Sequence, residues 1–333
     1  MSGAVPFGLP VDGTLAQDIL ERLGAVEDLL RETVRSSDDM LLTESSKHLV
    51  EAGGKRFRPM LLLLASHFGD PAAAGIVPAA VVVELTHLAT LYHDDVMDEA
   101  VMRRGQVSAN SRWTNTIAIL TGDYLFARAS ELLADLGPEA VRIQARTFAR
   151  LVRGQIQETV GPDTDADPLK HYLQVVADKT ASLIATSGQF GAMLAGAPPH
   201  VVDTVTSACE KIGVAFQLSD DILDIASDSD QSGKTPGTDL REGVHTLPVL
   251  HVLAAQDNKS VRLRELLRTA DLTDDALHAE ALDLLRAHPA MERARLDLRR
   301  WAGDARTELR TLPDGPARAS FESLCDYVVS RTG

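Results

Sequence analysis

The chain has 333 residues, of which 33 are Lys or Arg and 48 are Asp or Glu, so its formal net charge at pH 7 is -15. That charge argues against nucleic acid as a partner, because phosphate backbones recruit basic surfaces. The cysteines, Cys209 and Cys325, lie far apart without a C-x-x-C spacing, which argues against a zinc site or a disulfide framework. They fit a reducing cytoplasm, where we expect the protein to work.

Apolar residues recur at three- and four-residue spacing over long stretches, which predicts an all-α fold, a helical bundle. The helical stretches are Leu15–Leu30, Gly75–Val101, Thr116–Leu136 and Glu139–Val160. The segments rich in helix breakers are short enough to be loops: Met1–Gly13, Gly161–Pro168, Gly196–His200 and Asp228–Gly243. We therefore expect one domain over residues 1–333, with residues 1–13 flexible. The apolar runs around Leu61–Ala65 and Ala79–Val83 are expected to be too short to span a bilayer.

Glycines and cations precede a helix that is expected to begin near Pro59. Residues Gly53–Pro59 read G-G-K-R-F-R-P, and proline is tolerated in the first helical turn. Backbone N–H groups at a helix start, flexible glycines and Lys or Arg side chains together favour a phosphate group. The segment therefore predicts an anion site, with a solvated basic surface as the plain alternative.

Two clusters of the same D-D-x-x-D design, Asp94–Asp98 and Asp220–Asp224, lie far apart in the chain. On a helix the first and fifth residues lie one above the other, so each cluster presents stacked carboxylates that repel one another unless a cation binds. Mg²⁺ prefers such hard oxygens and completes its shell with water and phosphate oxygens. One cluster alone is more often a solvated helix face. Two clusters that each interrupt an apolar stretch predict metal sites and a diphosphate substrate, with these expected ligands: Asp94, Asp98, Asp220, Asp221 and Asp224.

Further polar residues lie near the clusters in sequence. Arg103 and Arg104 follow Asp98 by little more than a helical turn, near enough to reach an anion bound at the metal. His87 lies about two turns before the first cluster and on its face, although a lone His there is more often a core residue. Other candidates for binding a diphosphate are Lys179, Thr180 and Lys234.

At these motifs the chain resembles the trans-isoprenyl diphosphate synthases, or polyprenyl synthetases. The matching segments occur in that family's order and cover most of the chain from about Lys47 to Leu250. They are G-G-K-R-F-R-P at Gly53–Pro59, H-L-A-T-L-Y-H-D-D-V-M-D at His87–Asp98, R-R-G at Arg103–Gly105, G-D-Y-L at Gly122–Leu125, K-T at Lys179–Thr180, F-Q-L-S-D-D-I-L-D at Phe216–Asp224 and G-K-T-P-G-T-D-L at Gly233–Leu240. The resemblance implies the all-α isoprenoid synthase type I fold, with a central active-site cavity, the acidic clusters across its mouth, and a homodimer.

The resemblance also implies an activity and roles for the site residues. Such enzymes condense isopentenyl diphosphate head to tail with an allylic diphosphate, which is geranyl, farnesyl or geranylgeranyl diphosphate. Asp94, Asp98 and Asp220 would bind a trinuclear Mg²⁺ cluster that grips the allylic diphosphate. Its other oxygens would be held by Arg103, Lys179 and Lys234, with Thr180 and Gln217 close by. Isopentenyl diphosphate would be held by Lys55, Arg58, His87 and Arg104.

The helix that leads into the first cluster is expected to set product length, because the growing chain runs back along it. Short-chain relatives commonly carry an aromatic residue at the fourth or fifth position before the motif, where this chain has Thr90 and Ala89. The next positions, Leu85 with Thr86 and then Val82, also lack aromatics. We therefore expect a medium- to long-chain all-trans product, released with some peripheral membrane contact. A farnesyl or geranylgeranyl product is the alternative, and a side chain such as Phe126 or Phe148 would be able to close the path.

One position departs from the family's pattern. Val244-His245 precedes Thr246 where many relatives carry a lysine, so a cation is missing there unless His245 is protonated.

Two other classes of protein share part of the pattern. A non-catalytic partner subunit usually loses one acidic cluster, and this chain keeps both. A class I terpene cyclase would carry an N-S-E-type second motif and no basic segment for isopentenyl diphosphate.

Overall fold

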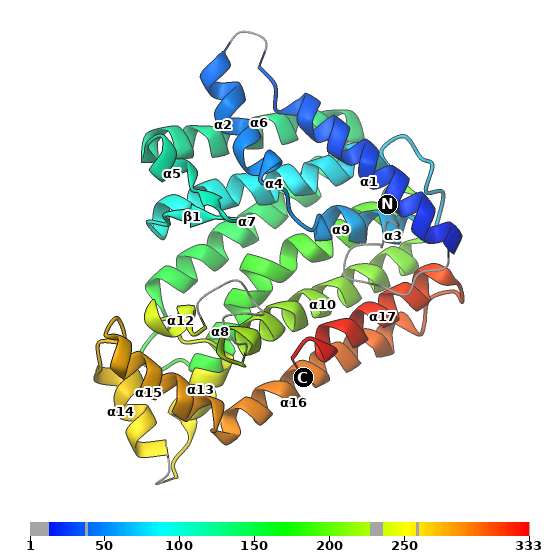
Figure 1. Cartoon of the computed structure of the whole chain (residues 1–333). Helices are drawn as coiled ribbons and strands as arrows, with labels where there is room; N and C mark the ends of the chain where they lie inside the picture. Colours follow the sequence, from blue (N-terminus) through cyan, green and yellow to red (C-terminus); the bar gives the residue numbers. More distant parts are fainter. Residues whose placement is uncertain (1–12, 37–38, 227–235, 258–259, 333) are drawn as a thin grey trace. The chain divides into compact units, whose positions relative to one another are not determined.

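The computed structural model describes residues 13–36, 39–226, 236–257 and 260–332, which form helices, short loops and one two-stranded hairpin (Figure 1). The chain groups into two compact units. The first unit comprises residues 1–149, 183–207 and 309–321, and the second comprises residues 150–182, 208–308 and 322–333. The single domain expected over residues 1–333 stays a prediction, and residues 1–12 of the segment expected to be flexible lie outside the described residues.

The first unit contains α1 (Gly13–Thr33), α2 (Met40–Glu51), α3 (Phe57–Ser66), α4 (Ile76–Met97), β1 (Met102–Arg103), β2 (Gln106–Val107), α5 (Ala109–Arg112), α6 (Asn115–Leu136), the start of α7 (Pro138–Val160) and nearly all of α9 (Ser182–Leu194). The second unit contains the rest of α7, α8 (Pro168–Val176), the π-helical turn η2 (Ala177–Ala181), most of α10 (Pro199–Ala226), α12 (Thr238–Arg241), α13 (Leu247–Ala254), α14 (Val261–Thr269), α15 (Asp275–Arg286) and α16 (Pro289–Leu309), while α17 (Pro316–Ser330) contributes to both. The four predicted helical stretches correspond to α1, α4, α6 and α7, although α4 ends at Met97, four residues before the predicted end at Val101. The predicted loop Asp228–Gly243 differs in part, because its end forms α12.

Close packing in the first unit depends on small residues where helices meet. A Cβ added to Gly122 on α6 would lie 2.3 Å from His93 Nε2 and 3.1 Å from the Ala89 carbonyl oxygen on α4. A Cβ on Gly191 of α9 would lie 2.1 Å from the Leu62 carbonyl oxygen on α3. Glycine at these positions lets the backbones approach. Gly122 therefore holds α6 against the part of α4 that leads into the first acidic cluster.

Helix α4 is the long apolar element of the first unit. Its 22 residues, Ile76–Met97, are apolar enough to cross a membrane by length and composition, but 67% of the apolar window is buried within the protein. The sequence-based expectation considered only the short run Ala79–Val83 and so underestimated the length of this apolar segment. Its burial identifies α4 as a core helix.

The second unit contains most of α10 and of the helices that follow it. α14 packs on α15 and α13, and α13 also contacts α8 (Figure 1). His278 Nε2 of α15 forms a hydrogen bond of 2.8 Å with the Gly237 carbonyl. This bond ties the start of α12 to α15. Cys209 and Cys325 are buried and free, as expected for core residues.

Candidate active site

The first acidic cluster lies at the end of α4. Asp98 caps this helix, and its N–H donates to the Asp94 carbonyl at 2.8 Å. Asp94 is half-buried and Asp98 is exposed, one helical turn apart, so they lie on the same side of the helix. The C-terminal end of a helix is the negative end of its dipole, which disfavours further negative charge. A cation bound here would relieve the repulsion between the two carboxylates and the repulsion of each by the helix dipole.

Between these residues, Asp95 is fully buried with one oxygen engaged. Its Oδ1 accepts a hydrogen bond from Arg103 Nε at 2.6 Å, whereas its Oδ2 is buried without a hydrogen-bond partner among the described residues. Burial raises the pKa of Asp95 against the opposing effect of Arg103, and Asp98 adds to the rise. A buried carboxylate oxygen without a partner is costly, so this cluster is suited to take up a further positive or donor group.

The β1–β2 hairpin aims the two arginines that follow the first cluster. Arg103 pairs with Gln106 across the hairpin, so Arg104 and Gly105 form its two-residue turn with φ of 52° and 76°. A two-residue hairpin turn of this type requires positive φ at both positions, which is strained for arginine, and such strain clusters at functional sites. The turn directs Arg103 to Asp95. It directs Arg104 to the carbonyl groups of the segment that leads out of α2.

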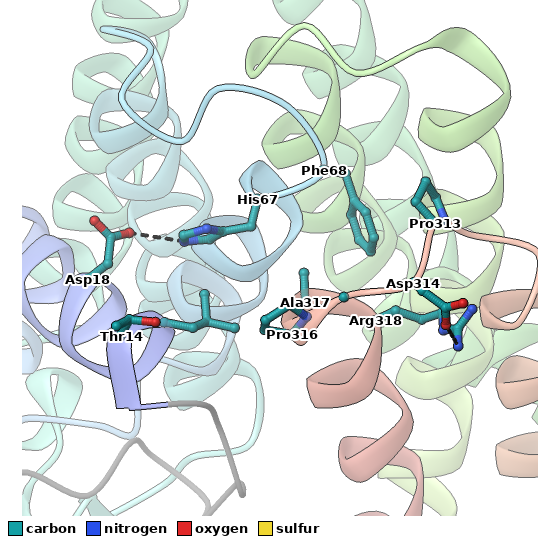
Figure 2. Close-up of a pocket in the computed structure, with 11 residues that line it drawn as sticks. Thr14, Asp18, His67, Phe68, Pro313, Asp314, Pro316, Ala317 and Arg318 are labelled. Carbon is teal, nitrogen blue, oxygen red and sulfur yellow. Dashed lines mark hydrogen bonds and ion pairs between the residues drawn. The ribbon is translucent and has the colours of Figure 1, made fainter.

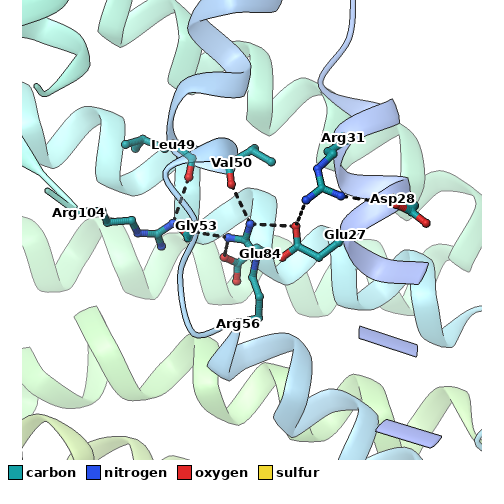
Figure 3. A network of polar contacts seen from close by, with 9 residues as sticks. All are labelled: Glu27, Asp28, Arg31, Leu49, Val50, Gly53, Arg56, Glu84 and Arg104. Atoms are coloured by element: carbon teal, nitrogen blue, oxygen red, sulfur yellow. Dashed lines mark hydrogen bonds and ion pairs between the residues drawn. The ribbon is translucent and has the colours of Figure 1, made fainter. Parts of the chain in front are cut away.

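Both glycines of the basic segment lie beside Arg104: the Gly53 carbonyl accepts a hydrogen bond from its guanidinium group (Figure 3), and Gly54 leaves room for that group. Arg104 Nη1 donates to the Leu49 carbonyl at 3.2 Å and to the Gly53 carbonyl. A Cβ on Gly54 would lie 2.9 Å from Arg104 Nη1. Arg56, which the sequence grouped with the anion-binding cations, is instead buried in an ion-pair network with Glu84 at 2.8 Å and with Glu27. Arg56 therefore stabilises the Gly53–Pro59 segment from its buried side.

Arg58, His87 and Arg104 form a positive environment in the first unit. Arg58 Nε is buried without a hydrogen-bond partner among the described residues. Burial lowers the pKa of Arg58 to about 10 against the opposing charge of Glu84, and Arg104 adds to the lowering. Burial, followed by the charges of Arg58, Arg104 and Arg103, holds the pKa of His87 well below its ordinary value. The ring is therefore neutral at neutral pH and offers one N–H donor. Desolvated arginines with an unused donor suit an anion such as a diphosphate. We name Arg58, His87 and Arg104 the arginine–histidine group.

The second acidic cluster lies near the end of α10, and each of its aspartates has partners in the second unit. Asp220 Oδ1 accepts from Arg331 Nη2 at 2.6 Å, and the Arg331 guanidinium lies 4.8 Å above the centre of the Phe216 ring. Asp224 accepts the N–H groups of Thr238 and Asp239, each at 3.2 Å. Asp224 thus also caps the start of α12.

Asp221 is the buried member of the second cluster. It is 2% exposed, and it accepts from the Tyr172 hydroxyl, from Gln217 Nε2 at 3.0 Å and from the Leu247 N–H at 3.3 Å. Burial raises its pKa to about 6 against these hydrogen bonds. Its oxygens are already occupied by three donors, so a metal could reach them only if this network opened. Its expected role as a metal ligand therefore stays a prediction.

The K-T motif lies on η2. Lys179 forms an ion pair with Glu158 of α7, and the Thr180 hydroxyl donates to Gln217 Oε1 at 3.2 Å. Gln217 thereby links Thr180 to Asp221. Lys234, expected to bind the same diphosphate, lies outside the described residues. In the loop where a lysine is common in relatives, His245 is exposed.

The expected chain-length positions lie on α4 and are almost all fully buried. Ala89, Leu85, Thr86 and Val82 have no exposed surface, and Thr86 accepts a hydrogen bond from Gln144 at 2.7 Å. Thr90 alone among the five is half-buried. On the facing helices, the rings of Phe126 and Phe148 lie 4.4 Å apart, and His93 lies 5.9 Å from Phe126. Space for a growing chain is therefore more available beside Thr90 than beside Ala89.

A cavity of about 520 Å³ lies elsewhere in the first unit, where α1, the end of α3 and the start of α17 meet (Figure 2). Asp18 and His67 form a hydrogen bond of 3.0 Å on its wall, and Phe68 and Pro316 also line it. None of the candidate site residues lines this cavity.

Three residues in contact with the site were missed from the sequence: Arg331, Tyr172 and Asp178. The first two bind aspartates of the second cluster, and Asp178 lies on η2 beside Lys179. Arg331 is 111 positions from Asp220 and Tyr172 is 49 positions from Asp221, so no local spacing connects them. Only Asp178 carried a signal, because it adjoins the K-T motif.

The donors of both clusters fit a hard divalent cation. All the candidate ligands are carboxylates, the oxygen donors that Mg²⁺ prefers. Within the described ranges, no three His, Cys, Asp or Glu side chains are close enough to hold a metal by themselves. Mg²⁺ commonly binds one or two carboxylates and takes the rest of its shell from water and substrate phosphates. The arrangement therefore suits a metal that binds together with a diphosphate.

Comparison with known proteins places this chain in a family. The polyprenyl synthetase family model matches residues 39–285. The nonaprenyl diphosphate synthase of Mycobacterium tuberculosis is 50% identical over 323 residues, which cover 97% of this chain and 96% of the relative. A solved geranylgeranyl pyrophosphate synthase from Corynebacterium glutamicum, complexed with calcium and isoprenyl diphosphate, aligns with a TM-score of 0.87 at 45% identity, over 97% of this chain and 98% of that one. A decaprenyl diphosphate synthase from Rhodobacter capsulatus aligns with a TM-score of 0.87 at 37% identity, over 96% and 99% of the two chains.

An all-α protein with two aspartate clusters and a group of desolvated arginines has the features expected of the prenyltransferases that act on diphosphates. The chain belongs to the polyprenyl synthetase family, and it is a prenyltransferase that makes prenyl diphosphates. Enzymes of this family use isopentenyl and allylic diphosphates, and the calcium-bound relative supports a divalent metal as the cofactor. The predicted family, all-α fold and enzyme class are thus confirmed.

Proposed function

We propose that this enzyme uses Mg²⁺ at the two aspartate clusters to extend an allylic diphosphate with isopentenyl diphosphate to an all-trans product longer than geranylgeranyl. The observation that carries the proposal lies in the first unit. Asp94 and Asp98 at the end of α4 suit a metal, and the arginine–histidine group supplies a desolvated positive site that suits a diphosphate. A prenyl diphosphate synthase requires both.

Asp94, Asp98 and Asp220 are the proposed ligands of the metal cluster. When bound, Mg²⁺ stabilises the negative charge that grows on the allylic diphosphate as its C–O bond breaks. Arg103, Lys179 and Lys234 hold the remaining oxygens, with Thr180 and Gln217 beside them. Asp221 and Asp224 shape the second cluster through their present hydrogen bonds.

Isopentenyl diphosphate is held by Lys55 and the arginine–histidine group, with His87 donating an N–H as a neutral ring. Once the C–O bond of the allylic diphosphate breaks, the double bond of isopentenyl diphosphate attacks the allylic cation to form the new C–C bond, and the proton then lost passes to the departing diphosphate. No protein nucleophile is needed. The apolar helices exclude water, which would otherwise quench the allylic cation.

Exposed apolar side chains support two further parts of the proposal. Ile119 and Leu120 on α6 and Val141 on α7 are exposed in the first unit, which suits a homodimer contact. Met97 and Met102, beside the first cluster, are also exposed and suit contact with a membrane surface when an apolar product leaves. The two free, buried cysteines are consistent with a cytoplasmic enzyme.

Product sizing tests the proposed function. Purified enzyme is incubated with labelled isopentenyl diphosphate and, separately, geranyl, farnesyl and geranylgeranyl diphosphate, and the products are separated by chain length. Products longer than geranylgeranyl are expected with at least one primer. An enzyme that gave no product longer than geranylgeranyl with any of the three primers would contradict the proposed length.

A further inference from the structure

The K-T motif lies on a π-helical turn and not on a regular α-helix. η2 (Ala177–Ala181) lies between α8 and α9. An extra residue in one turn changes the direction of the side chains on it, and such turns are frequent at functional sites. Lys179 and Thr180 both lie on η2, so the contacts that fix this turn also fix both side chains.

Asp178 is the main anchor of this turn. Its carboxylate is fully buried and accepts from Arg150 Nε at 2.8 Å, Arg153 Nε at 2.9 Å and Gln174 Nε2 at 3.1 Å. Arg150 also donates to the Ala177 carbonyl at 3.3 Å. A buried ion pair is weak support for stability because desolvating the charges is costly. Four directional hydrogen bonds nevertheless define where the turn lies.

The same face of α7 approaches the turn closely. A Cβ on Gly154 would lie 2.6 Å from the backbone nitrogen of Lys179 and 3.1 Å from the Asp178 Cβ. A larger residue at position 154 would therefore push the turn away from α7. Glu158, one helical turn later, pairs with the Lys179 ammonium group. Arg150, Gly154 and Glu158 recur at four-residue spacing and therefore form one continuous stripe along α7.

On its other side the turn is linked to the second aspartate cluster. Thr180 donates to Gln217, and Gln217 Nε2 donates to Asp221 at 3.0 Å. The position of η2 thus determines both the direction of Lys179 and the support of the second acidic cluster.

Resting on the proposed role of Lys179 and Thr180 in binding the allylic diphosphate, we propose that Asp178 is the positioning residue of that site. Held by Arg150 and Arg153 and packed close to Gly154, it fixes the π-turn so that Lys179 and Thr180 are presented together to the diphosphate. Asp178 itself is buried and acts only through these neighbours.

Two substitutions test this inference by different physical routes. Asp178→Asn removes the charge that the arginines bind, and Gly154→Ala keeps every charge but displaces the turn. Each should raise the KM for farnesyl diphosphate, and its Kd measured calorimetrically with Mg²⁺, by roughly tenfold, the effect expected when charge-assisted contacts are misplaced. The KM for isopentenyl diphosphate should stay at the wild-type value, because its proposed ligands lie in the first unit. A merely structural effect would lower kcat through the folded fraction and leave both KM values unchanged.

Matched controls come from α16 in the same unit. Asp297→Asn removes a carboxylate that binds His251 at 2.8 Å and Arg300 at 3.0 Å. Gly303→Ala adds a Cβ that meets no atom within 4 Å. Both controls should keep the wild-type KM for farnesyl diphosphate.

Lys179→Ala separates the two possible failures. If Lys179→Ala raises the KM for farnesyl diphosphate while Asp178→Asn and Gly154→Ala do not, the positioning role of Asp178 is wrong and the proposed function stands. If Lys179→Ala leaves it unchanged, the proposed role of Lys179 is wrong. If Asp178→Asn fails to fold, Gly154→Ala decides the question.

Discussion

His87 illustrates at the residue scale how surroundings decide the role of a side chain. The sequence left it between a core residue and a ligand of isopentenyl diphosphate. In the structure, burial and then Arg58, Arg104 and Arg103 lower its pKa, so it stays neutral among positive charges. A neutral donor there can bind a diphosphate oxygen without adding to the repulsion between the arginines.

We expect His87→Ala to raise the KM for isopentenyl diphosphate by roughly tenfold, the value of one hydrogen bond to a charged group. The KM for the allylic diphosphate should remain near the wild-type value. Steady-state kinetics with each substrate varied in turn measures the two effects, and His200→Ala, an exposed site on α10, serves as the control. An equal rise in both KM values would show that His87 supports the whole site.

Asp178 predicts a pH dependence of stability. Burial alone would raise the pKa of Asp178, but hydrogen bonds from Arg153, Arg150 and Gln174 outweigh it, and the pKa is lowered from 3.8. A lowered folded-state pKa means that ionised Asp178 stabilises the fold above the unfolded-state pKa, and that this contribution is lost as the pH falls through the folded-state pKa. Asp178→Asn should therefore lower the free energy of unfolding by roughly 2 kcal/mol at neutral pH.

Urea unfolding of both proteins from about pH 7 to about pH 3 measures this difference. The gap between wild type and Asp178→Asn should narrow as the pH falls below 3.8. A gap that stayed constant down to the lowest pH would rule out a stabilising ionised Asp178.

At the scale of elements, α4 combines the metal-binding end with the proposed product path. Its positions Ala89, Leu85 and Val82 are fully buried, whereas Thr90 is half-buried. A large side chain at Ala89 would overpack the α4–α6 contact and destabilise the protein by about 1–3 kcal/mol. Thr90 offers a position where product length can be changed with less strain.

We expect Thr90→Phe to shift the products toward short chains while the first condensation continues, because an aromatic ring blocks the path and spares every proposed diphosphate ligand. Thr90→Ser should keep the wild-type product length. Product sizing with farnesyl diphosphate as primer measures the shift, and thermal unfolding checks the fold. Wild-type chain length in Thr90→Phe would show that the product takes another path.

The elements also show which features a sequence can reveal. The acidic clusters and the long helices have local patterns, and the structure places the clusters on α4 and α10 as those patterns require. The partners of these motifs have no local pattern, because Arg331 reaches Asp220 from another helix. The π-turn itself was also invisible, since it depends on how Asp178 meets α7. Packing between helices, and not helix propensity, decided these features.

At the scale of the whole molecule, a net charge of -15 contrasts with substrates that are themselves anions. Exposed charges are screened within about 10 Å at moderate salt, so the overall charge acts weakly on a bound diphosphate. Desolvated arginines at the arginine–histidine group are screened much less. Binding is therefore governed by local cations and metal.

The central claim is that both aspartate clusters bind the metal on which condensation depends. The most direct measurement is the rate of labelled isopentenyl diphosphate incorporation onto farnesyl diphosphate, with and without Mg²⁺, for wild type, Asp94→Ala and Asp220→Ala. Exposed Asp135→Ala and Asp283→Ala serve as controls for the two units, and thermal unfolding checks each fold. Each cluster variant should lose more than about a hundredfold in kcat, because several kcal/mol of charge stabilisation disappear, while the controls remain active. Near-normal, Mg²⁺-dependent turnover in either cluster variant would contradict the claim.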